Sequence, residues 1–383
     1  MKFRNSRLWR ASVAAVAAAG MAVAFAACSS GAPGSGAGGG SSDGAGTGSL
    51  DGDGASIVVF MPTTSNSYIK ADADAIKAEG DRLGYKVKVF ENNFDQTEQD
   101  QQVQEWLATG EEPAGILFWP SAGEAATNSI RLLSQRAPVI QFNQGIQPSA
   151  EEFVEAYAGV SDRGIGDQAG KSALEAIEAQ KAAGVSFHGP DGKPNLIEIR
   201  FPTGYVAGDE RHEAFMEATG DAFNVLTVEP AKAPDAQSGF DAASQVIPQM
   251  KSQGIDFIYT QNNNIGAGVV QALEQNGLVP GKDVIIVAGD FSGDKTPLRE
   301  GKIYSAVIQS PVIEGILVMR TMAQYLATGE VTDGTVNLET SEEMPELEME
   351  PPARTTYMMN PPITKDSYDS FKIWGMGVDE LVF

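Results

Sequence analysis

The chain contains few of the side chains on which enzymes and metal proteins usually depend. Its 383 residues include one cysteine, Cys28, and two histidines, His188 and His212. Their spacing does not match a metal site, and no Gly-x-Ser-x-Gly sequence follows a strand-like run, as a nucleophile elbow would require. We therefore expect no metal, no cofactor and no catalytic residue, which favours a binding protein over an enzyme. One cysteine cannot form an internal disulfide, and the lack of thiols elsewhere fits an oxidising exterior.

Basic residues and long apolar runs are also scarce. The chain has 27 Lys and Arg against 51 Asp and Glu, a net charge of −24 at pH 7. So acidic a surface repels phosphate backbones, and we expect no binding to nucleic acid. Beyond residue 27, no apolar run is long enough to span a bilayer. If the protein is attached to a membrane, the N-terminal residues are therefore the part expected to attach it.

Residues 1–27 have the pattern of an export signal. Residues 1–10 carry four positive charges and no negative one, and residues 11–27 form an apolar, alanine-rich run. The letters FAAC that end at Cys28 resemble the cleavage site of bacterial lipoproteins, which implies a lipid on Cys28 and anchoring to the outer face of the cell membrane. The alternatives are an ordinary secretory signal with a spare thiol and an uncleaved anchor. Removal of residues 1–27 leaves 23 basic against 51 acidic residues, a net charge of −28.

Residues 28–55 are rich in Gly and Ser and contain too little apolar surface to form a core. Chain of this composition behaves as a flexible coil. The letters DGDG at residues 51–54 lack the downstream Asp and Glu ligands of a calcium loop. We interpret the segment as a tether between Cys28 and a folded body.

The letters GDQAGKS at residues 166–172 resemble a phosphate-binding loop but have the wrong spacing. Such a loop needs Gly, four residues and then Gly-Lys-Ser, so that successive N–H groups point at one phosphate. The residue five before Gly170 is Ile165, not glycine. We interpret the segment as the start of a helix capped by Asp162, with Lys171 on the solvent face. An ATPase is therefore not expected.

From residue 56 onward, short β-branched runs alternate with longer amphipathic ones. SIVVFM is followed by YIKADADAIKAEGDRLG, and later NLIEIR is followed by GDERHEAFMEATG. Strands that alternate with helices of this length indicate right-handed βαβ units and parallel sheets. The body exceeds one comfortable core, so we expect two α/β domains that separate near residues 156–164.

The segments that follow these strands are rich in Asn, Gln, Asp and aromatic residues, as in PTTSNSY, FNQG, QNNN and GDFSG. Ligands of open parallel sheets bind beyond the carboxyl ends of the strands. Amides and carboxylates bind hydroxyl pairs, and aromatic rings cover C–H surfaces. The pattern predicts a site for a molecule rich in hydroxyl groups.

Seven such motifs, in order between residues 57 and 327, resemble the sugar-binding solute receptors of ABC importers, of the ribose/galactose-binding type. The resemblance implies two Rossmann-like lobes with parallel sheets, joined by crossing hinge strands, which is the type I periplasmic-binding-protein fold. It places the N-terminal lobe at 56–160, completed by about 310–335. The C-terminal lobe is then 161–309, completed by part of 336–383.

The same resemblance implies a set of ligand-binding side chains, with Trp119 as a stacking platform. Asn143 and Gln144 occupy the place of an Asp-Arg pair in the family, which argues against simply assuming ribose as the ligand. The full predicted set is Asn66, Tyr68, Trp119, Asn143, Gln144, Arg211, Asn262, Asp290 and Gln309.

Each of these residues also has a structural interpretation. Asn66 can cap the helix that follows it, and Trp119 can be ordinary core at a strand end. Arg211 can pair with Asp209 or Glu210 on a solvated helix. Asn262–Asn264 can form a plain turn, in which Asn tolerates left-handed backbone. The functional interpretation depends on their convergence at strand ends and not on any one residue.

We therefore predict a monomeric, non-catalytic, lipid-anchored receptor outside the cytoplasm. It would capture a neutral sugar or polyol between two lobes and deliver it to an ABC permease. The alternatives are a receptor for nucleosides or a furanone signal on the same fold, a sensor that presents its ligand to a membrane kinase, and a secreted hydrolase. In the tail, residues 336–383, the acidic middle is expected on the surface and the apolar end FKIWGMGVDELVF against a lobe, without an assigned function.

Overall fold

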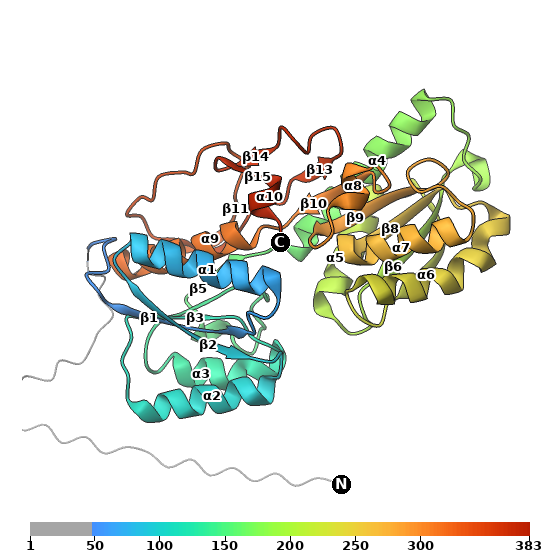
Figure 1. The fold of residues 1–383 in the computed structure, drawn as a ribbon. Coiled ribbons are helices and arrows are strands. Elements are labelled where there is room, and N and C mark those ends of the chain that lie inside the picture. The colour runs from blue at the N-terminus through green and yellow to red at the C-terminus, as the bar shows by residue number, and fades with distance from the viewer. Residues whose placement is uncertain (1–47) are drawn as a thin grey trace, which may run out of the picture. The chain divides into compact units, whose positions relative to one another are not determined.

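Two mainly parallel sheets form the framework of residues 48–383, the part of the chain that the computed structural model describes (Figure 1). The predicted signal peptide, Cys28 and most of the predicted tether lie outside these residues. The predicted fold class, α/β lobes with parallel sheets, is confirmed. Among residues 48–383, no helix combines the length and apolarity needed to cross a membrane.

The N-terminal lobe contains a seven-stranded, all-parallel sheet in the order β11-β12-β5-β4-β3-β1-β2. Alternate residues of its strand β1 enter two separate cores, because successive side chains point to opposite faces. Ile57 and Val59 pack on the side of α1 and α9, and Val58 and Phe60 pack on the side of α2 and α3. The elements are β1 (Ser56–Pro62), α1 (Ser67–Arg82), β2 (Lys86–Asn92), α2 (Gln96–Thr109), β3 (Gly115–Phe118), η1 (Glu124–Ala126), α3 (Thr127–Leu133), β4 (Val139–Gln141), η2 (Glu151–Phe153), β5 (Ala156–Gly159), α9 (Pro311–Thr328), β11 (Thr332–Asn337) and β12 (Ala353–Tyr357).

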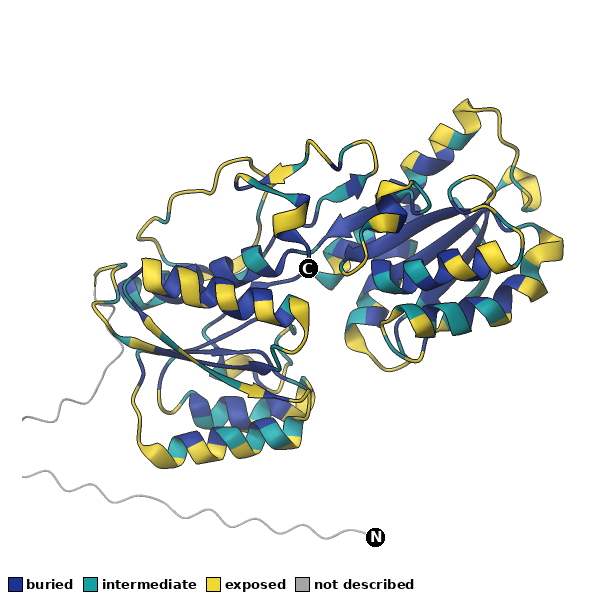
Figure 2. Cartoon of the chain, in the orientation of Figure 1, coloured by how far each residue is buried: buried dark blue, intermediate teal, exposed yellow. Residues whose placement is uncertain are grey.

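The C-terminal lobe contains a six-stranded sheet in the order β13-β10-β9-β8-β6-β7, in which only β13 runs antiparallel to its neighbour. Helices α4 and α5 pack as one pair and α6 and α7 as another. Figure 2 shows the central strands buried and the helices exposed along their outer sides, whereas the edge strand β7 is only partly buried. The elements are α4 (Asp162–Ala182), η3 (Pro190–Gly192), β6 (Asn195–Arg200), α5 (Val206–Thr219), β7 (Asn224–Pro230), α6 (Ala236–Met250), η4 (Lys251–Gln253), β8 (Phe257–Asn262), α7 (Asn263–Gln275), β9 (Ile285–Phe291), α8 (Thr296–Arg299), β10 (Ser305–Ile308) and β13 (Pro362–Thr364).

The chain crosses between the two sheets three times: from β5 into α4, from β10 into α9, and from β12 into β13. Main-chain hydrogen bonds join the three crossings. Met358 N donates to Gly159 O at 2.8 Å, and Ile308 N donates to Pro361 O at 2.9 Å. The crossings therefore lie side by side, as hinge strands do.

The glycines that resemble a phosphate loop allow two helices to pack closely. The whole segment is helical within α4, and its cap is Ser161, whose side chain accepts from Gly164 N; the prediction that Asp162 caps the helix was wrong. A Cβ atom on Gly166 would lie 2.3 Å from Arg211 O on α5. Lys171 is exposed and pairs with Asp167 at 2.6 Å.

The first described residues belong to the N-terminal lobe. Gly48 N donates to Ala327 O at 2.9 Å, and Gly52 N donates to Leu83 O at 2.8 Å. Leu50 packs against the core. Residues 48–55, predicted as part of the tether, are therefore attached to the lobe.

The tail contacts elements of both lobes. Its acidic stretch, residues 339–350, is largely exposed, as expected. Beyond it, Trp374 stacks with Arg320 of α9, while Asp379 pairs with Lys295 beside α8 at 3.0 Å. The strands β14 (Lys372–Ile373) and β15 (Met376–Gly377) and the helix α10 (Val378–Leu381) hold this segment together.

Candidate ligand-binding site

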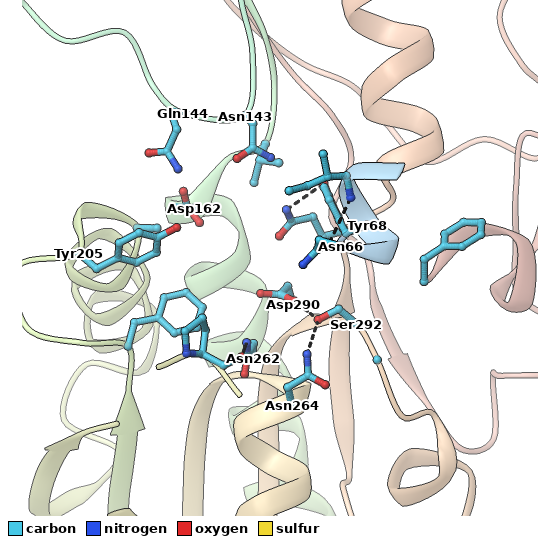
Figure 3. Close-up of a pocket in the computed structure, with 18 of the residues that line it drawn as sticks. Asn66, Tyr68, Asn143, Gln144, Asp162, Tyr205, Asn262, Asn264, Asp290 and Ser292 are labelled. Carbon is cyan, nitrogen blue, oxygen red and sulfur yellow. Dashed lines mark hydrogen bonds between the residues drawn. The ribbon is translucent and has the colours of Figure 1, made fainter. Parts of the chain in front are cut away.

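A cavity of about 250 Å³ lies where the strands of both sheets end (Figure 3). Parallel strands bring their carboxyl ends to one edge, and residues far apart in the sequence meet there. The volume suits a small polar molecule rather than a large ligand. All nine predicted side chains line it: Asn66 and Tyr68 after β1, Trp119 after β3, Asn143 and Gln144 after β4, Arg211 on α5, Asn262 at the end of β8, Asp290 in β9, and Gln309 after β10. Their contact with a ligand stays a prediction.

On the N-terminal side, Asn66 and Tyr68 are held by the start of α1. The Oδ1 atom of Asn66 accepts from Ile69 N at 3.2 Å, so this residue caps the helix as well as lining the cavity. The Tyr68 hydroxyl donates to Oε2 of Glu314 at 2.7 Å and accepts from Nε2 of Gln309 at 3.0 Å. Both hydrogen-bonding roles of the hydroxyl are thus taken within the protein.

Trp119 is mainly a core residue, with 5% of its surface exposed. Its ring meets Tyr68 and Phe142 edge-on, with centroids 6.4 and 5.6 Å away. Only a small part of the indole can touch a ligand, and a stacking role for Trp119 stays a prediction. The exposed aromatic rings at the cavity are instead Phe94, Tyr205 and Phe383, at 54%, 43% and 39% exposed.

On the C-terminal side, Arg211 is 4% exposed and lies between two carboxylates. Its guanidinium bonds Asp162 at 2.7–2.8 Å, Asp290, and the main-chain oxygen of Gln261 at 2.8 Å. Burial lowers the pKa of Arg211, but the two carboxylates outweigh it, and the overall shift is upward. The neighbour Asp209 pairs with Arg200, so the surface partner considered for Arg211 was wrong.

Asp290 and Gln309 connect this charged group to the rest of the cavity. Oδ1 of Asp290 accepts from Ser292 Oγ at 2.8 Å and faces the cavity (Figure 3). Oε1 of Gln309 accepts from Arg211 at 3.2 Å, while its amide nitrogen donates to Tyr68. Gln309 therefore links the two lobes through one side chain.

Asn262 has a structural role that the sequence left open. Its Oδ1 accepts from Ile265 N at 2.8 Å as the cap of α7, and its Nδ2 donates to Pro234 O at 3.1 Å. With 4% exposure, it presents little to a ligand. The neighbouring Asn264 lines the cavity and reaches Ser292 Oγ at 3.4 Å.

Several lining residues were not predicted. Asp162, Asn264 and Tyr205 carried a signal, because all three follow strands: β5, β8 and β6. Phe94 follows β2 and carried the same signal, but the segment after this strand was not considered. Phe383 carried none, since it lies far from every strand end.

The cavity offers acceptors on Asp290 and Asn143, one buried cation and several ring surfaces, which suits hydroxyl groups with C–H faces. None of the histidines within residues 48–383 lines it. Within residues 48–383, no group of three or more His, Cys, Asp or Glu side chains is arranged to hold a metal ion.

The chain is similar to known proteins over most of its length. A family described as periplasmic binding protein domain matches residues 57–330. The ribose import binding protein RbsB of Salmonella typhimurium is 25% identical over 259 residues, which are 67% of this chain and 79% of that protein. A solved structure, a periplasmic ribose ABC transporter protein from Conexibacter woesei, superposes with a TM-score of 0.67 at 18% identity, covering 85% of this chain and 96% of its own. A solute binding protein from Actinobacillus succinogenes with bound D-allose superposes with a TM-score of 0.64 at 16% identity, covering 83% of this chain and 100% of its own.

Proposed function

The chain belongs to the periplasmic binding protein family, and from that premise we propose that it captures a neutral sugar or polyol between its lobes and delivers it to an ABC permease. Members of the family are solute-binding proteins, so the chain is a receptor and not an enzyme. The relative from Salmonella typhimurium is named for ribose import, and the structure from Actinobacillus succinogenes holds D-allose. Both names favour a monosaccharide.

One observation carries the proposal: polar side chains from the strand ends of both lobes line a single cavity. A ligand there would touch Asn143 on one lobe and Asp290 on the other. Such a ligand favours the closed arrangement, because only a molecule with different affinities for two states shifts their populations. The permease would then recognise the closed, ligand-bound arrangement.

The polarity of the cavity favours a neutral ligand. Arg211 is already neutralised by Asp162 and Asp290, and among the described residues it is the one cation that lines the cavity. An anionic group would therefore lack a free cation from this part of the chain. The remaining carboxylate and amide acceptors suit hydroxyl donors. Aromatic rings at the rim cover C–H faces of a sugar.

The location and partners follow from the family. A periplasmic binding protein works outside the cytoplasm, with an ABC permease as its partner. We infer that a lipid on Cys28 keeps this chain at the outer face of the cell membrane and that the receptor acts as a monomer. Mass spectrometry of membrane-extracted protein tests the lipid, and light scattering tests the monomer.

Thermal unfolding with a panel of ligands tests the proposal. Protein that begins at Ser29 is heated with D-ribose, L-arabinose, D-allose, glycerol, nucleosides and amino acids. A ligand at one hundred times its Kd adds about 2.7 kcal/mol to the free energy of unfolding. For lobes of this size, the melting temperature should rise by about 5–10 °C.

A rise with one sugar or polyol would support the proposal and identify the ligand. A rise with nucleosides alone would favour the nucleoside receptor, whose base would rest on the exposed rings of Phe94 and Tyr205. If no sugar or polyol shifts the transition, the sugar receptor is contradicted.

A further inference from the structure

Two acidic side chains are buried together where α1 meets α9, behind Tyr68. Asp72 on α1 and Glu314 on α9 are each 0% exposed. Gly315 permits the approach, because a Cβ atom there would lie 2.8 Å from Oδ1 of Asp72. Neither carboxyl lines the ligand cavity.

Glu314 holds two residues that do line the cavity. Its Oε2 accepts from the Tyr68 hydroxyl at 2.7 Å and from Nδ2 of Asn143 at 3.0 Å. These two donors stabilise the ionised form of Glu314. The other oxygen, Oε1, has no hydrogen-bond partner among residues 48–383.

Asp72 differs, because neither of its carboxyl oxygens has a hydrogen-bond partner among residues 48–383. A buried, unpaired carboxylate is unfavourable, and burial together with the charge of Glu314 raises the pKa of Asp72. Burial without a partner therefore favours the protonated form of Asp72, whereas the donors to Glu314 favour its ionised form.

Within residues 48–383, the groups around the pair are neutral or acidic. The titratable groups that face it are Tyr68 on α1, Tyr157 on β5 and Asp162 on α4. No Lys, Arg or His of residues 48–383 forms an ion pair with either carboxyl, and Arg211 is held by Asp162 and Asp290. Further along the same two helices, Glu79 is neutralised by Arg82 and Arg320 at 2.7 Å.

We propose that Glu314 is a positioning residue of the ligand site, whose ionised carboxylate sets which atoms Asn143 and Tyr68 present to the ligand. This inference rests on the proposed function. A carboxylate only accepts hydrogen bonds, so Asn143 must point its amide nitrogen at Glu314 and its carbonyl oxygen elsewhere. Asn143 then presents an acceptor to a ligand hydroxyl. Tyr68, whose hydroxyl is engaged by Glu314 and Gln309, presents its ring.

Protonation of Glu314 removes this constraint. Burial raises the pKa of Glu314 to about 7, although the hydrogen bonds from Tyr68 and Asn143 lower it. Below that pH, the protonated carboxyl of Glu314 can also donate a hydrogen bond. The side-chain amide of Asn143 can then flip, so that its carbonyl oxygen faces Glu314. Affinity should therefore fall as the pH drops from 8 to 5.5, by at most about tenfold per pH unit.

The first arm of the test uses ligand-free protein. The side-chain amide of Asn143 is followed by ¹⁵N NMR from pH 5 to 9 and assigned with Asn143→Asp. Its resonances should titrate with a midpoint near pH 7 and should not titrate in Glu314→Gln. Asn143 amide resonances that do not change with pH, or that titrate equally in Glu314→Gln, would overturn the proposal, whichever ligand the protein binds.

The second arm measures the Kd of D-ribose, L-arabinose and D-allose by calorimetry at pH 8 and pH 5.5. The wild type should bind several-fold more weakly at pH 5.5, and Glu314→Gln should bind weakly with no difference between the two pH values. The matched control is Glu79→Gln, which removes a buried carboxylate from the same helix pair and should keep the wild-type pH dependence.

The two arms separate the two possible failures. A Kd that does not change with pH in the wild type would refute the role of Glu314. Absence of binding by any sugar, with the Asn143 amide titrating as expected, would refute the proposed function and leave the positioning of Asn143 by Glu314 supported.

Discussion

At the scale of single residues, Arg211 contributes most to the charge balance of the cavity. It is buried, and it is the group that separates the carboxylates of Asp162 and Asp290. Removal of one member of a buried ion group leaves the others uncompensated, which costs far more than the group contributes when intact. Arg211 therefore has a structural role besides any contact with a ligand.

We expect Arg211→Met to lower the free energy of unfolding by about 3–5 kcal/mol at pH 7, because two carboxylates then face each other without a cation. Urea unfolding of the wild type and the variant at pH 7 measures the deficit. An unchanged free energy of unfolding would contradict the structural role of Arg211.

The sequence predicted which residues lie at the site, because that depends on their position at strand ends. It did not predict how far each side chain is exposed, because that depends on packing. The motifs at strand ends identified nine side chains that line one cavity, because parallel strands bring their ends together. The exposure of a side chain depends on its neighbours in three dimensions. The sequence therefore did not show that Trp119 is covered by Phe142 or that Tyr205 is open.

The sequence also did not predict the buried pair of acidic residues. Asp72 and Glu314 are separated by most of the chain, and each lies in a segment that reads as an ordinary amphipathic helix. Only the packing of α1 on α9 brings them together. A polar residue on a buried helix face is visible in a sequence only when the partner of that face is known.

At the scale of elements, the contact between α4 and α5 depends on glycine. A Cβ atom on Gly166 would lie 2.3 Å from the main-chain oxygen of Arg211, which cannot move without shifting α5. Since α5 carries Arg211, the spacing of the two helices also sets the position of its guanidinium. The glycines that resemble a phosphate loop therefore affect the cavity through helix packing.

We expect Gly166→Ala to destabilise the protein by about 1–3 kcal/mol, as overpacking of a close contact does. The control is Gly145→Ala, whose Cβ would meet nothing within 4 Å. Thermal unfolding of both variants tests the difference. Equal melting temperatures would mean that α4 and α5 separate at little cost.

The contacts of the tail, residues 336–383, with both lobes could not be predicted from its composition. Its apolar end was expected on one lobe, but Trp374 packs against Arg320 of α9 while Asp379 pairs with Lys295 beside α8. Phe383 accepts from Gly293 N at 3.2 Å and lines the cavity. These contacts come from the return of the chain after β13, which local sequence patterns do not encode.

At the scale of the whole molecule, charge is the dominant feature. Residues 48–383 contain 23 basic and 50 acidic residues, a net charge of −27. A compact body with this excess repels itself, and salt screens the repulsion over about 10 Å at 0.1 M.

We therefore expect the melting temperature to rise by a few degrees between about 10 and 200 mM NaCl, as screening weakens the repulsion. Differential scanning calorimetry at fixed pH measures it, with potassium fluoride to separate screening from specific chloride effects. A melting temperature that stays constant or falls with salt would mean that local ion pairs outweigh the net charge.

The parallel pairing of β12 with β5 has a consequence for the order in which the molecule folds. Ala156 begins β5 and Ala353 begins β12, so a neighbour in the N-terminal sheet is synthesised last. Until α9 exists, the face of α1 that packs against α9 is uncovered. The N-terminal lobe therefore cannot fold to completion on a growing chain, and its assembly waits for contacts that are distant in sequence, which makes folding slow. The N-terminal lobe becomes native only when almost the whole chain is available.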